Sequence, residues 1–588
     1  MKATTKAKKS EAEGDPGDCR SVGFRSVPLL RRIKPATPRV WKRVRAYSQQ
    51  VRLDPSPQEH AFYYAGDQQL AQWIRDAIER LGAPTRALLA SHLKTSHRPR
   101  RLCTVCSGTD SPALVYKALR QATNDIFNWE HTFSCDIDPI VRQFLVTATP
   151  TFQHLFKSSR EITCEQLALD VAACLDGSDE GGKLVGIPDS DDLVAGFPCQ
   201  DCSNLQVKRM QNRTVVCDGA KRTGSVFHDL LKIAAARKVT SIVLENVTGL
   251  GAPSRTDGHS NLDYVFKFLE LNGWWGKCFR LDPRMCGMPV SRHRFWILAV
   301  KMSELAAAGI NRDEADTLTT DFMDCLLSAN DGVLPVRDLD DFLLPDDNPI
   351  IRGYLANLVH ERQAASSSPM SRGSWLGKTA AYVESAQLKR QRNGQPVGPD
   401  WWAPVYPTDD VLEMFPGLLD LTDRELSLLA AHGVSVTSCD ALRKRAKQTI
   451  NTTQGCERAS SSRDGESTIV TPRGNVFLQH RVRKAHGLEA LLLQGLHYGP
   501  SQHRLVDTFA SADLHRLAGN AFNGYCCAAV VLARECLLAV VAQRTRERHQ
   551  NQPARPIAHA PTSFRGQYRK GRSMAELFGD EIEIDSDA

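Results

Sequence analysis

The sequence has 588 residues, 42% of them hydrophobic and 24% charged, with a formal net charge of +7. This length allows a large catalytic core and a second domain. The lysine-rich start, residues 1–10, lacks the apolar core of a signal peptide, and the most apolar late stretch, 526–542, carries Arg534 and Glu535 in its middle. We therefore expect a soluble intracellular protein that does not span a membrane.

Cysteine is frequent, with 17 residues, but the cysteines are scattered and show no paired spacing typical of zinc ligands. We expect reduced core cysteines and no metal site. The modest positive charge permits binding to nucleic acid without indicating it, so the positions of the charges matter more than their sum.

Residues 1–55 combine the lysine-rich start with a run of arginine and lysine that is broken by Pro35 and Pro38, which predicts a disordered basic arm. Residues 56–302 then alternate short apolar runs with segments of helical spacing. The expected strands are 102–106, 132–135, 192–195, 241–244 and 295–300, and the expected helices are 113–119, 140–146, 226–236 and 262–271. Such alternation predicts a doubly wound, mainly parallel α/β sheet as the catalytic core.

The order loosens in residues 303–480, where acidic turns, Ser- and Gly-rich stretches and a basic helical piece at 443–447 predict a separate, smaller and irregular domain. Helical, apolar-periodic sequence returns within 481–545, which we expect to rejoin the core. The polar residues 546–588 are expected to form a disordered tail.

Cys199 follows the apolar run 192–195, in the sequence Gly-Phe-Pro-Cys-Gln-Asp-Cys-Ser. A strand that runs into a turn here would expose the cysteine at the carboxyl end of the sheet, where open α/β sheets bind ligands. Its thiolate can add to an electron-poor ring if nearby cations or a helix end lower the pKa of the thiol. Taken alone, a buried structural cysteine is the more common case.

Two further predicted strands carry charged side chains. Glu245 ends the run Ser-Ile-Val-Leu-Glu and could protonate a ring nitrogen at the same edge, or serve as a turn carboxylate. A third strand is expected to begin at Pro289, in Pro-Val-Ser-Arg-His-Arg-Phe, with Arg292 and Arg294 alternating along it. Arginines on an apolar element require an anion or a polar acceptor, or form a salt bridge at the rim.

These motifs, Gly-Phe-Pro-Cys-Gln-x-x-Ser, Glu-Asn-Val and Ser-Arg-x-Arg, occur in an order that resembles the DNA cytosine-5 methyltransferase family. The resemblance covers roughly residues 102–300 and 481–542. Residues 106–111 look like that family's cofactor loop, 492–496 like a late motif that supports the recognition domain, and 518–521 like its closing motif.

The resemblance implies a Rossmann-like methyltransferase sheet, a target-recognition domain at 303–480 and S-adenosyl-L-methionine as the methyl donor. It implies that the target cytosine is flipped out of its stack, that Cys199 adds to C6 of the ring and that Glu245 protonates N3. Arg292 and Arg294 would hold the base and the loop around it. The implied cofactor-binding residues are Ser107, Gly108, Thr109, Asp136, Pro198, Val226, Asn520 and Ala521.

Asp136 is the best supported of these cofactor residues, because an acidic residue after the second strand suits a ribose diol, and Asp138 is its nearest rival. The chain also departs from the family pattern. Asp110 and Ser111 replace glycines of the cofactor loop, and Val290 replaces a glutamine before Ser-Arg-x-Arg. A clear acidic partner for the adenine amino group is missing; the candidates are Ser158 and Asp170.

Two groups outside the motifs could contact nucleic acid. The loop 202–222 is basic and could close over a phosphate backbone, or be a solvated surface loop. Its charged residues are Lys208, Arg209, Arg213, Asp218, Lys221 and Arg222. The tryptophans Trp375, Trp401 and Trp402, with the basic piece 443–447, could read a groove or stack on a base, although core positions are the more common role for tryptophan.

The leading hypothesis is therefore a nuclear DNA (cytosine-5-)-methyltransferase, with the cytoplasm as the alternative location. Two other readings remain open. One branch of the family methylates transfer RNA, but its Cys-Phe-Thr tripeptide is absent here. A non-catalytic nucleic-acid-binding relative is the other alternative: the altered cofactor loop favours it, and the intact Cys199 and Glu245 oppose it.

Overall fold

The computed structural model describes the chain from residue 57 to residue 551, with gaps, and the following statements concern the described residues. These are 57–95, 98–162, 171–174, 183–202, 214–219, 221–253, 258–329, 332–365, 387–388, 391–392, 394, 406–453, 461–468, 470–472, 474–499 and 501–551. The predicted disordered arm, residues 1–55, lies outside them.

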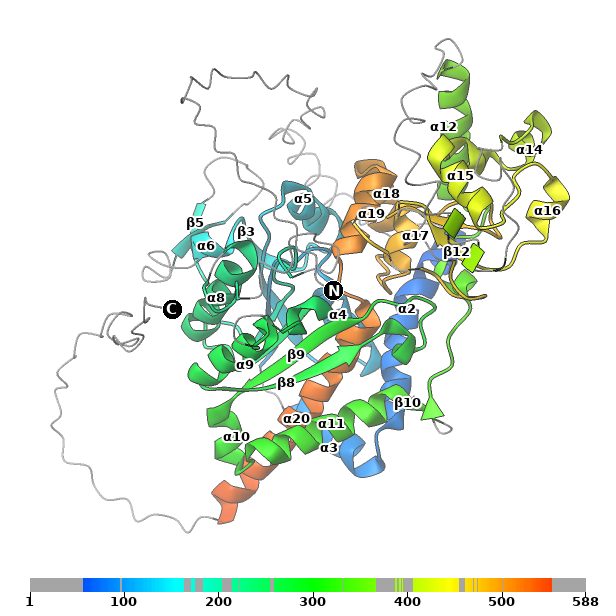
Figure 1. Cartoon of the computed structure of the whole chain (residues 1–588). Coiled ribbons are helices and arrows are strands. Elements are labelled where there is room, and N and C mark those ends of the chain that lie inside the picture. The colour runs from blue at the N-terminus through cyan, green and yellow to red at the C-terminus, as the bar shows by residue number, and fades with distance from the viewer. Residues whose placement is uncertain are drawn as a thin grey trace, which may run out of the picture.

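A nine-stranded sheet forms the centre of the described structure, with its strands in the order β5-β4-β3-β2-β1-β6-β7-β9-β8 (Figure 1). The strands are β1 (Arg100–Val105), β2 (Trp129–Cys135), β3 (Phe152–Phe156), β4 (Val171–Cys174), β5 (Lys183–Gly186), β6 (Asp192–Ala195), β7 (Ser241–Val247), β8 (Trp274–Leu281) and β9 (Arg294–Lys301). Five neighbouring strands, β3, β2, β1, β6 and β7, are parallel, whereas β9 is antiparallel to both β7 and β8. The chain runs outward from β1 to β3 and then returns to β6, which confirms the predicted doubly wound fold.

The strands are apolar on both sides because helices cover both faces of the sheet. On β6, Val194 packs into one hydrophobic cluster, while Leu193 and Ala195 pack into the other. The first cluster involves α2 (Pro57–Arg80), α3 (Ala83–Thr95), α4 (Ser111–Ala122), α10 (Met302–Ala308), α11 (Arg312–Leu327) and α20 (Gly524–Asn551). The second involves α8 (Lys221–Ala236) and α9 (Asn261–Leu271).

Helix α20 runs through the first cluster and packs against α3, α4, α10 and α11. The helical stretch Ser511–Asn551 is apolar enough to cross a membrane by length and composition, but 94% of its most apolar window is buried inside the protein. It is therefore a core element, as expected from Arg534 and Glu535 in its middle. α20 also continues to Asn551, so residues 546–551, expected in the tail, are helical.

A second region lies beside the sheet, at the upper right of Figure 1. It contains α12 (Pro349–Ala365), α14 (Asp409–Met414), α15 (Asp423–Ala431), α16 (Cys439–Arg443), and a small sheet of β12 (Thr449–Asn451), β13 (Val476–Leu478) and β14 (Arg483–Lys484). Most of these elements share a hydrophobic core of their own, built around Leu428, Ile450 and Phe477. The basic piece 443–447 is not helical beyond Arg443, where α16 ends.

Three aspartates join this second region to the core, and we call Asp338, Asp340 and Asp346 the acidic clasp. Asp340 accepts hydrogen bonds from His480 (3.0 Å) and Arg481 (2.8 Å), and Lys447 lies 3.0 Å away. Lys447 also donates to Asp338 at 2.7 Å. The third aspartate of the clasp, Asp346, pairs with Arg481 at 2.9 Å and with Arg483 at 3.2 Å.

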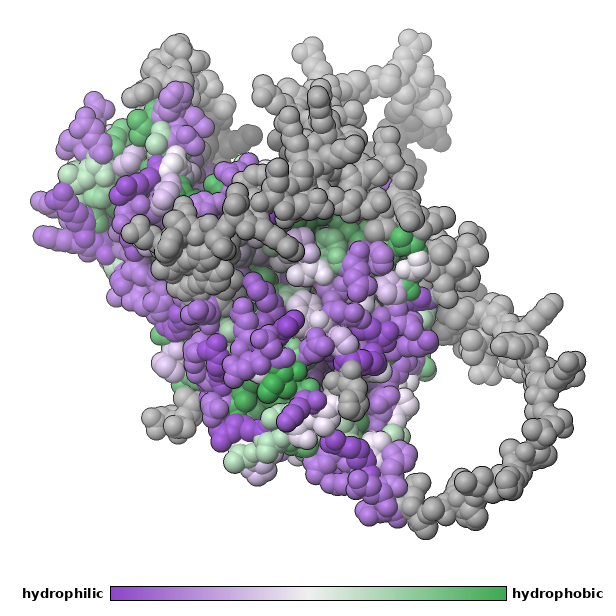
Figure 2. Space-filling view, turned by 180° about the vertical axis from the view of Figure 1, so that it is seen from behind, coloured by the Kyte–Doolittle hydropathy of each residue, from purple (hydrophilic) through white to green (hydrophobic). Residues whose placement is uncertain are grey.

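The helices α17 (Gly487–Leu492), α18 (Ser501–Thr508) and α19 (Ser511–Asn520) link β14 to α20. α18 packs against α5 (Pro139–Ala148), so this late segment returns to the carboxyl edge of the sheet. The face of the molecule shown in Figure 2 is mostly hydrophilic, with hydrophobic residues exposed in several small, separate patches.

Candidate active site

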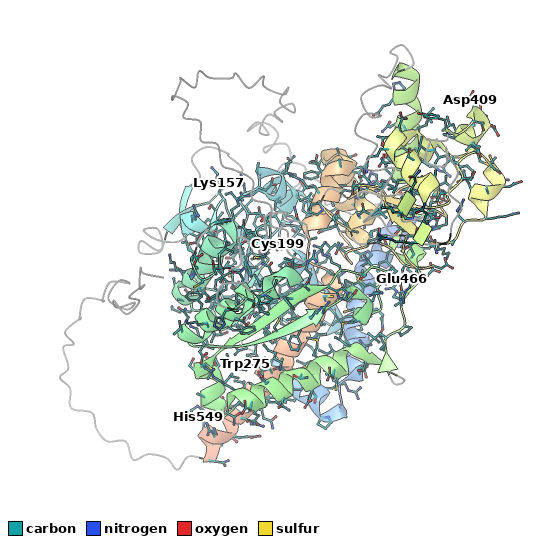
Figure 3. All side chains as sticks on the ribbon, in the orientation of Figure 1. Lys157, Cys199, Trp275, Asp409, Glu466 and His549 are labelled. Atoms are coloured by element: carbon teal, nitrogen blue, oxygen red, sulfur yellow. The ribbon has the colours of Figure 1, made fainter. Side chains whose placement is uncertain are left out.

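Cys199 lies in a short turn just after β6, and it appears near the middle of the molecule in Figure 3, between Lys157 and Glu466. All four residues of β6 are buried, so core packing holds the strand in place. The turn that follows is partly exposed at Gly196, Pro198 and Cys199. The Cys202 N–H donates to the Cys199 carbonyl (3.0 Å), and the Asn246 side chain donates to the Phe197 carbonyl (3.1 Å). These two bonds hold the cysteine at the carboxyl end of the parallel sheet.

Glu245 lies at the same edge because β7 is the parallel neighbour of β6, with Leu244 opposite Ala195. Its side chain is buried and forms an ion pair with Arg294, whose Nε lies 3.0 Å from Glu245 Oε1. Arg294 begins β9, the antiparallel neighbour, opposite Val247. Three adjacent strands thus bring a thiol, a carboxylate and a guanidinium group to one edge of the sheet.

The electrostatics of this group favour uncharged forms of its two acids. Burial raises the pKa of the Cys199 thiol, Glu245 raises it further, and Arg294 and Arg292 lower it. Burial also raises the pKa of Glu245, against the two arginines. A carboxyl group whose pKa is raised keeps its proton to a higher pH than an exposed glutamate and could give it to a ring nitrogen.

Arg292 does not lie on a strand, so the prediction that a strand begins at Pro289 and carries both arginines is wrong: β9 begins at Arg294. Arg292 is instead buried in the preceding segment. Its guanidinium group donates to the carbonyls of Val470 (2.9 Å), Gly519 (3.0 Å) and Ala521 (3.1 Å). Burial lowers its pKa to about 9. The acceptors that a buried arginine requires are thus backbone carbonyls of the closing segment and of the second region.

The predicted cofactor loop, Ser107 to Thr109, follows β1 and turns through Gly108 at a positive φ of 54°. The Gly108 N–H donates to Oδ2 of Asp136 at 3.0 Å. Asp136 directly follows β2, and burial raises its pKa to about 6. Asp138 has other partners, because it caps α5 through the Ile140 N–H (2.9 Å) and pairs with Arg516 (3.3 Å). Asp136 is therefore the carboxylate held against the loop.

The predicted closing residues, Asn520 and Ala521, come to the same place at the end of α19. A Cβ atom on Gly108 would lie 3.9 Å from the Asn520 carbonyl, and Ser111 donates to the Phe522 carbonyl at 3.2 Å. The Phe522 ring in turn packs on Gly196, at the start of the nucleophile turn.

The two remaining cofactor candidates, Pro198 and Val226, are both half-buried; Pro198 precedes Cys199 and Val226 lies on α8. Together with the contacts of the closing segment, these positions place three chain segments side by side: the cofactor loop, the nucleophile turn and the closing segment.

Some residues in this group were not singled out from the sequence. Ile137 follows Asp136 and is 58% exposed, an unusual position for a large apolar side chain beside a carboxylate. Asn246 holds the nucleophile turn, and Asp201 accepts two hydrogen bonds from Thr223, at 3.2 and 3.0 Å. The sequence did contain a signal for Ile137, because a large apolar residue directly follows an acid at the end of a predicted strand.

Several other predictions find no support at this edge. Ser158 accepts from the Arg160 N–H (3.3 Å) at the start of the short helix α6 (Ser159–Ile162). In the basic piece 443–447, Arg443 contacts Met414 and Arg445 donates to the Gly433 carbonyl. Both arginines therefore contact residues of the second region, to which they belong. Other candidates lie outside the described residues: Asp170, Lys208, Arg209, Arg213, Trp375, Trp401 and Trp402.

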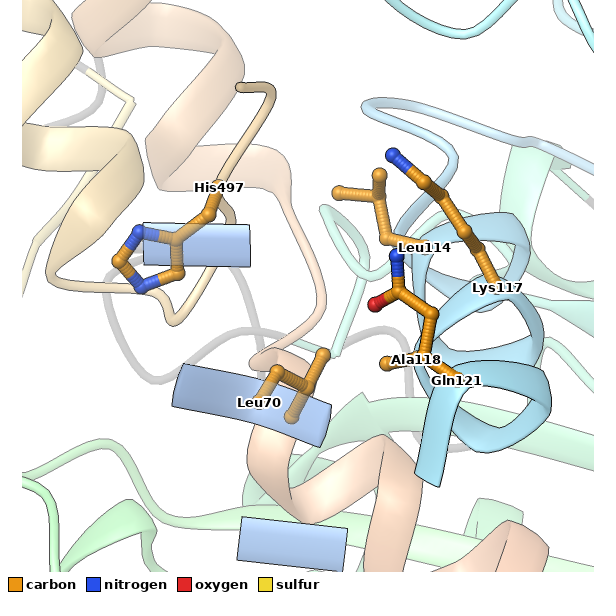
Figure 4. Close-up of a pocket in the computed structure, with 6 residues that line it drawn as sticks. All are labelled: Leu70, Leu114, Lys117, Ala118, Gln121 and His497. Carbon is orange, nitrogen blue, oxygen red and sulfur yellow. The ribbon is translucent and has the colours of Figure 1, made fainter. Parts of the chain in front are cut away.

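A shallow cavity lies elsewhere, between α2, α4 and the segment after α17 (Figure 4). It is lined by Leu70, Leu114, Lys117, Ala118, Gln121 and His497. None of these residues belongs to the group around Cys199. In the part of the chain that the structure describes, no cluster of His, Cys, Asp and Glu could hold a metal ion, and the described cysteines form no disulfide.

Residues 163–367 match the family model described as C-5 cytosine-specific DNA methylase. The curated protein DNA (cytosine-5-)-methyltransferase DMT5 of Cryptococcus neoformans is 24% identical over 450 residues, covering 72% of this chain and 16% of that protein. DMT5 of Verticillium dahliae is 27% identical over 505 residues, covering 75% of this chain and 19% of that protein. The chain thus spans under a fifth of the length of either fungal relative.

A shorter similarity links the chain to the type II methyltransferase M.MspI of Moraxella, which is 32% identical over 113 residues, 19% of this chain and 25% of that protein. Among solved structures, a methyltransferase of Entamoeba histolytica aligns with a TM-score of 0.38 and 12% identity, covering 74% of this chain and 98% of that one. The Dnmt2 methyltransferase of S. pombe aligns with a TM-score of 0.37, also at 12% identity, covering 75% of this chain and 98% of that one.

Proposed function

We propose that this chain, which carries a C-5 cytosine-specific DNA methylase domain, transfers a methyl group from S-adenosyl-L-methionine to C5 of cytosine in DNA. The observation that carries the proposal is the arrangement of Cys199, Glu245 and Arg294 at the carboxyl edge of three adjacent strands. A nucleophile beside a carboxyl group that can hold a proton suits attack on a pyrimidine ring.

In the proposed reaction the Cys199 sulfur bonds to C6 of a cytosine that has been flipped out of its stack. Glu245 gives a proton to N3 as the C5–C6 double bond opens, so that negative charge does not build up on the ring. Arg294 orients Glu245 through its 3.0 Å contact. After methylation at C5, loss of the C5 proton to solvent restores the double bond and expels the Cys199 sulfur as a thiolate. N3 then returns its proton to Glu245.

The residues around Gly108 fit a cofactor with a ribose and a charged amino-acid part. Gly108 lets the loop turn at a positive φ, and Asp136 offers a buried carboxylate for hydroxyl groups. The exposed Ile137 offers an apolar surface for a base. When bound there, S-adenosyl-L-methionine supplies the methyl group. The residues proposed to hold it are Ser107, Gly108, Thr109, Asp136, Pro198, Val226, Asn520 and Ala521.

Arg292 has a different proposed role from Arg294. Because its donors reach three backbone carbonyls, we assign it to holding the closing segment and the second region against the nucleophile turn. Residues 303–480 are proposed as the target-recognition domain, although α10 and α11 within this range pack on α20 of the core. The nucleus is the proposed location, because both fungal relatives are named as DNA methyltransferases.

The test is methyl transfer from labelled S-adenosylmethionine to unmethylated DNA, hemimethylated DNA and transfer RNA. Wild type and Cys199→Ser are compared, with Cys325→Ser as the matched control because Cys325 is an exposed cysteine on α11, outside the loops that follow β6, β7 and β1. We expect label in DNA with wild type and Cys325→Ser, and none with Cys199→Ser. Label in transfer RNA alone would assign the other substrate, and no transfer by a folded wild-type protein would assign a non-catalytic role.

The covalent step is tested separately with DNA that contains 5-fluorocytosine, whose C5 cannot lose a proton. We expect a complex of wild type with this DNA that survives denaturation and is absent with Cys199→Ser. Methylation without such a complex would contradict attack by the cysteine.

A further inference from the structure

Asp110 occupies an unusual position at the end of the cofactor loop. Its backbone is left-handed, with a φ of 54°, and it precedes the first residue of α4. Aspartate tolerates this conformation better than most residues. An aspartate before a helix usually caps the first turn with its side chain, but Asp110 makes no such bond. Its side chain is fully buried instead.

The side chain closes a ring of hydrogen bonds beneath the loop. Ser107 Oγ lies 2.8 Å from Thr104 Oγ1, which lies 2.9 Å from Ser134 Oγ. Ser134 Oγ lies 3.3 Å from Asp110 Oδ2, a contact in which either group can donate when the acid is neutral. The Asp110 N–H donates back to the Ser107 carbonyl at 2.7 Å. The ring links both ends of the loop to β1 and β2.

The carboxyl group of Asp110 has no cation beside it. Among the described residues its ion-pair partner within 4 Å is His131 of β2, at 3.7 Å, and burial lowers the pKa of His131 to about 3. Tyr498, whose hydroxyl group donates to the Thr109 carbonyl (2.9 Å), faces the same side, and burial raises its pKa. Both groups are neutral at pH 7. Oδ1 of Asp110 has no hydrogen-bond partner in the described structure.

We propose that Asp110 is a positioning residue for the cofactor, whose buried carboxyl group sets the geometry of the loop Ser107 to Thr109 and does so as a neutral acid. A buried carboxylate without a cation is costly, so the neutral form is favoured by the surroundings. Burial raises the pKa of Asp110 to about 7, against the neighbouring hydroxyl groups. The inference rests on the proposed cofactor site but not on the identity of the methyl acceptor.

Ionisation of Asp110 removes one proton from the set formed by Asp110, Ser134, Thr104 and Ser107, because each hydroxyl group has a single proton. The carboxylate requires Ser134 to donate to it. The three contacts that lead from Ser134 through Thr104 and Ser107 to the Cys135 carbonyl, 3.3 Å from Ser107 Oγ, then share two hydroxyl protons. The link between the cofactor loop and the strand that precedes Asp136 would weaken.

This predicts two opposite pH effects at one site. Asp136 accepts hydrogen bonds from hydroxyl groups more strongly when it is ionised, so cofactor binding should strengthen as the pH rises through about 6. Asp110 must be neutral, so binding should weaken as the pH rises through about 7. Wild type should therefore show a maximum of affinity between these values.

The experiment measures binding of S-adenosylhomocysteine by calorimetry from pH 5.5 to 8.5. Asp110→Asn mimics the neutral acid and tolerates the same backbone conformation. Asp125→Asn is the matched control, because Asp125 also has a positive φ (63°) but a side chain that is 74% exposed. We expect wild type and Asp125→Asn to lose affinity several-fold between pH 7 and 8.5, and Asp110→Asn to keep it. Parallel slopes for all three proteins would overturn the proposal.

A second readout needs no ligand. The folded-state pKa of Asp110 is raised, so its contribution to stability is present at low pH and is lost as the pH rises toward about 7. The urea midpoint of wild type should therefore fall relative to that of Asp110→Asn between pH 5.5 and 7.5. An unchanged difference would overturn the proposal. A protein that binds no S-adenosylhomocysteine but shows this shift would contradict only the proposed function.

Discussion

Arg292 and Arg294 are two positions apart but have different partners. Arg292 donates to three buried carbonyls and Arg294 contacts Glu245. A guanidinium group can satisfy several acceptors in one plane, whereas an ammonium group cannot reproduce that geometry. Arg292 thus acts as a structural clamp between backbone segments, whereas Arg294 forms an ion pair with the Glu245 carboxyl group.

Arg292→Lys should lower the free energy of unfolding by about 2–4 kcal/mol, because it leaves buried carbonyls without donors. Urea denaturation measures this change. Arg280→Lys, on the exposed edge strand β8, is the control and should change stability by less than about 0.5 kcal/mol. Equal effects of the two substitutions would argue against the clamp.

Glu245→Gln removes the proton donor but keeps the shape of the side chain. Loss of a general acid typically costs roughly 100-fold or more in rate, so kcat should fall by at least that factor with little change in the KM for the cofactor. Glu270→Gln is the control, since Glu270 is exposed on α9 and paired with Arg312. Activity of Glu245→Gln within threefold of wild type would exclude the proposed role.

Residues with a proposed chemical role were easier to identify in the sequence than residues proposed to support them. Cys199, Glu245 and Asp136 each follow a short apolar run, so their place at the edge of a parallel sheet could be derived from the sequence. Asp110 and Arg292 could not be interpreted in this way. Their function depends on hydrogen bonds to carbonyl and hydroxyl groups that are brought together by tertiary packing, and such bonds leave no pattern in the sequence.

The contact between β6 and the segment before α20 shows how elements meet at the site. A Cβ atom on Gly196 would lie 2.3 Å from the nearest atom of the Phe522 ring, so no side chain fits between the nucleophile turn and the closing segment. The close packing ties the position of Cys199 to that of Asn520.

Gly196→Ala should displace Phe522 and weaken S-adenosylhomocysteine binding about tenfold or more, with a loss of stability in the 1–3 kcal/mol range typical of overpacking. Calorimetry and urea denaturation measure the two effects. Gly353→Ala is the control, because a Cβ there meets nothing within 4 Å on helix α12. Partial recovery in Gly196→Ala with Phe522→Leu would support the steric cause, and unchanged binding in Gly196→Ala would contradict it.

At the scale of elements, the five predicted strands are present because each is a buried apolar run. Four strands of the sheet, β3, β4, β5 and β8, were not predicted. β3 contains Gln153 and His154, and β8 mixes Trp275 with Lys277. Their pairing with β2 and β9 stabilises them more than their composition does. The start of β9 was misplaced because an alternating Arg-x-Arg also occurs in an extended segment outside a sheet.

At the scale of the whole molecule, the acidic clasp decides how the second region is held. Asp340 contacts three basic side chains, Lys447, His480 and Arg481. Burial raises the pKa of its carboxyl group, but these side chains outweigh that effect and hold the pKa below its usual value. The contribution of Asp340 to stability is therefore present above the unfolded pKa of about 4 and is lost as the pH falls below it.

Asp340→Asn should loosen the second region without affecting the core. We expect faster hydrogen exchange in residues 406–453 and 474–484, a higher KM for DNA, and unchanged S-adenosylhomocysteine binding. Asp440→Asn is the control, because Asp440 is 82% exposed and pairs with Arg443 at 3.7 Å. A uniform change in exchange across the sheet would show that the clasp stabilises the whole protein instead.

Helix α20 has a consequence for the order in which the protein can be made. It fills the space between the sheet and α3, α4, α10 and α11, and its Arg534 lies 3.3 Å from Asp192 on β6, the strand that leads to Cys199. A ribosome releases β6 more than three hundred residues before α20 emerges. During that interval the apolar surface that α20 covers in the folded protein stays exposed, and such surface makes a nascent chain prone to aggregation.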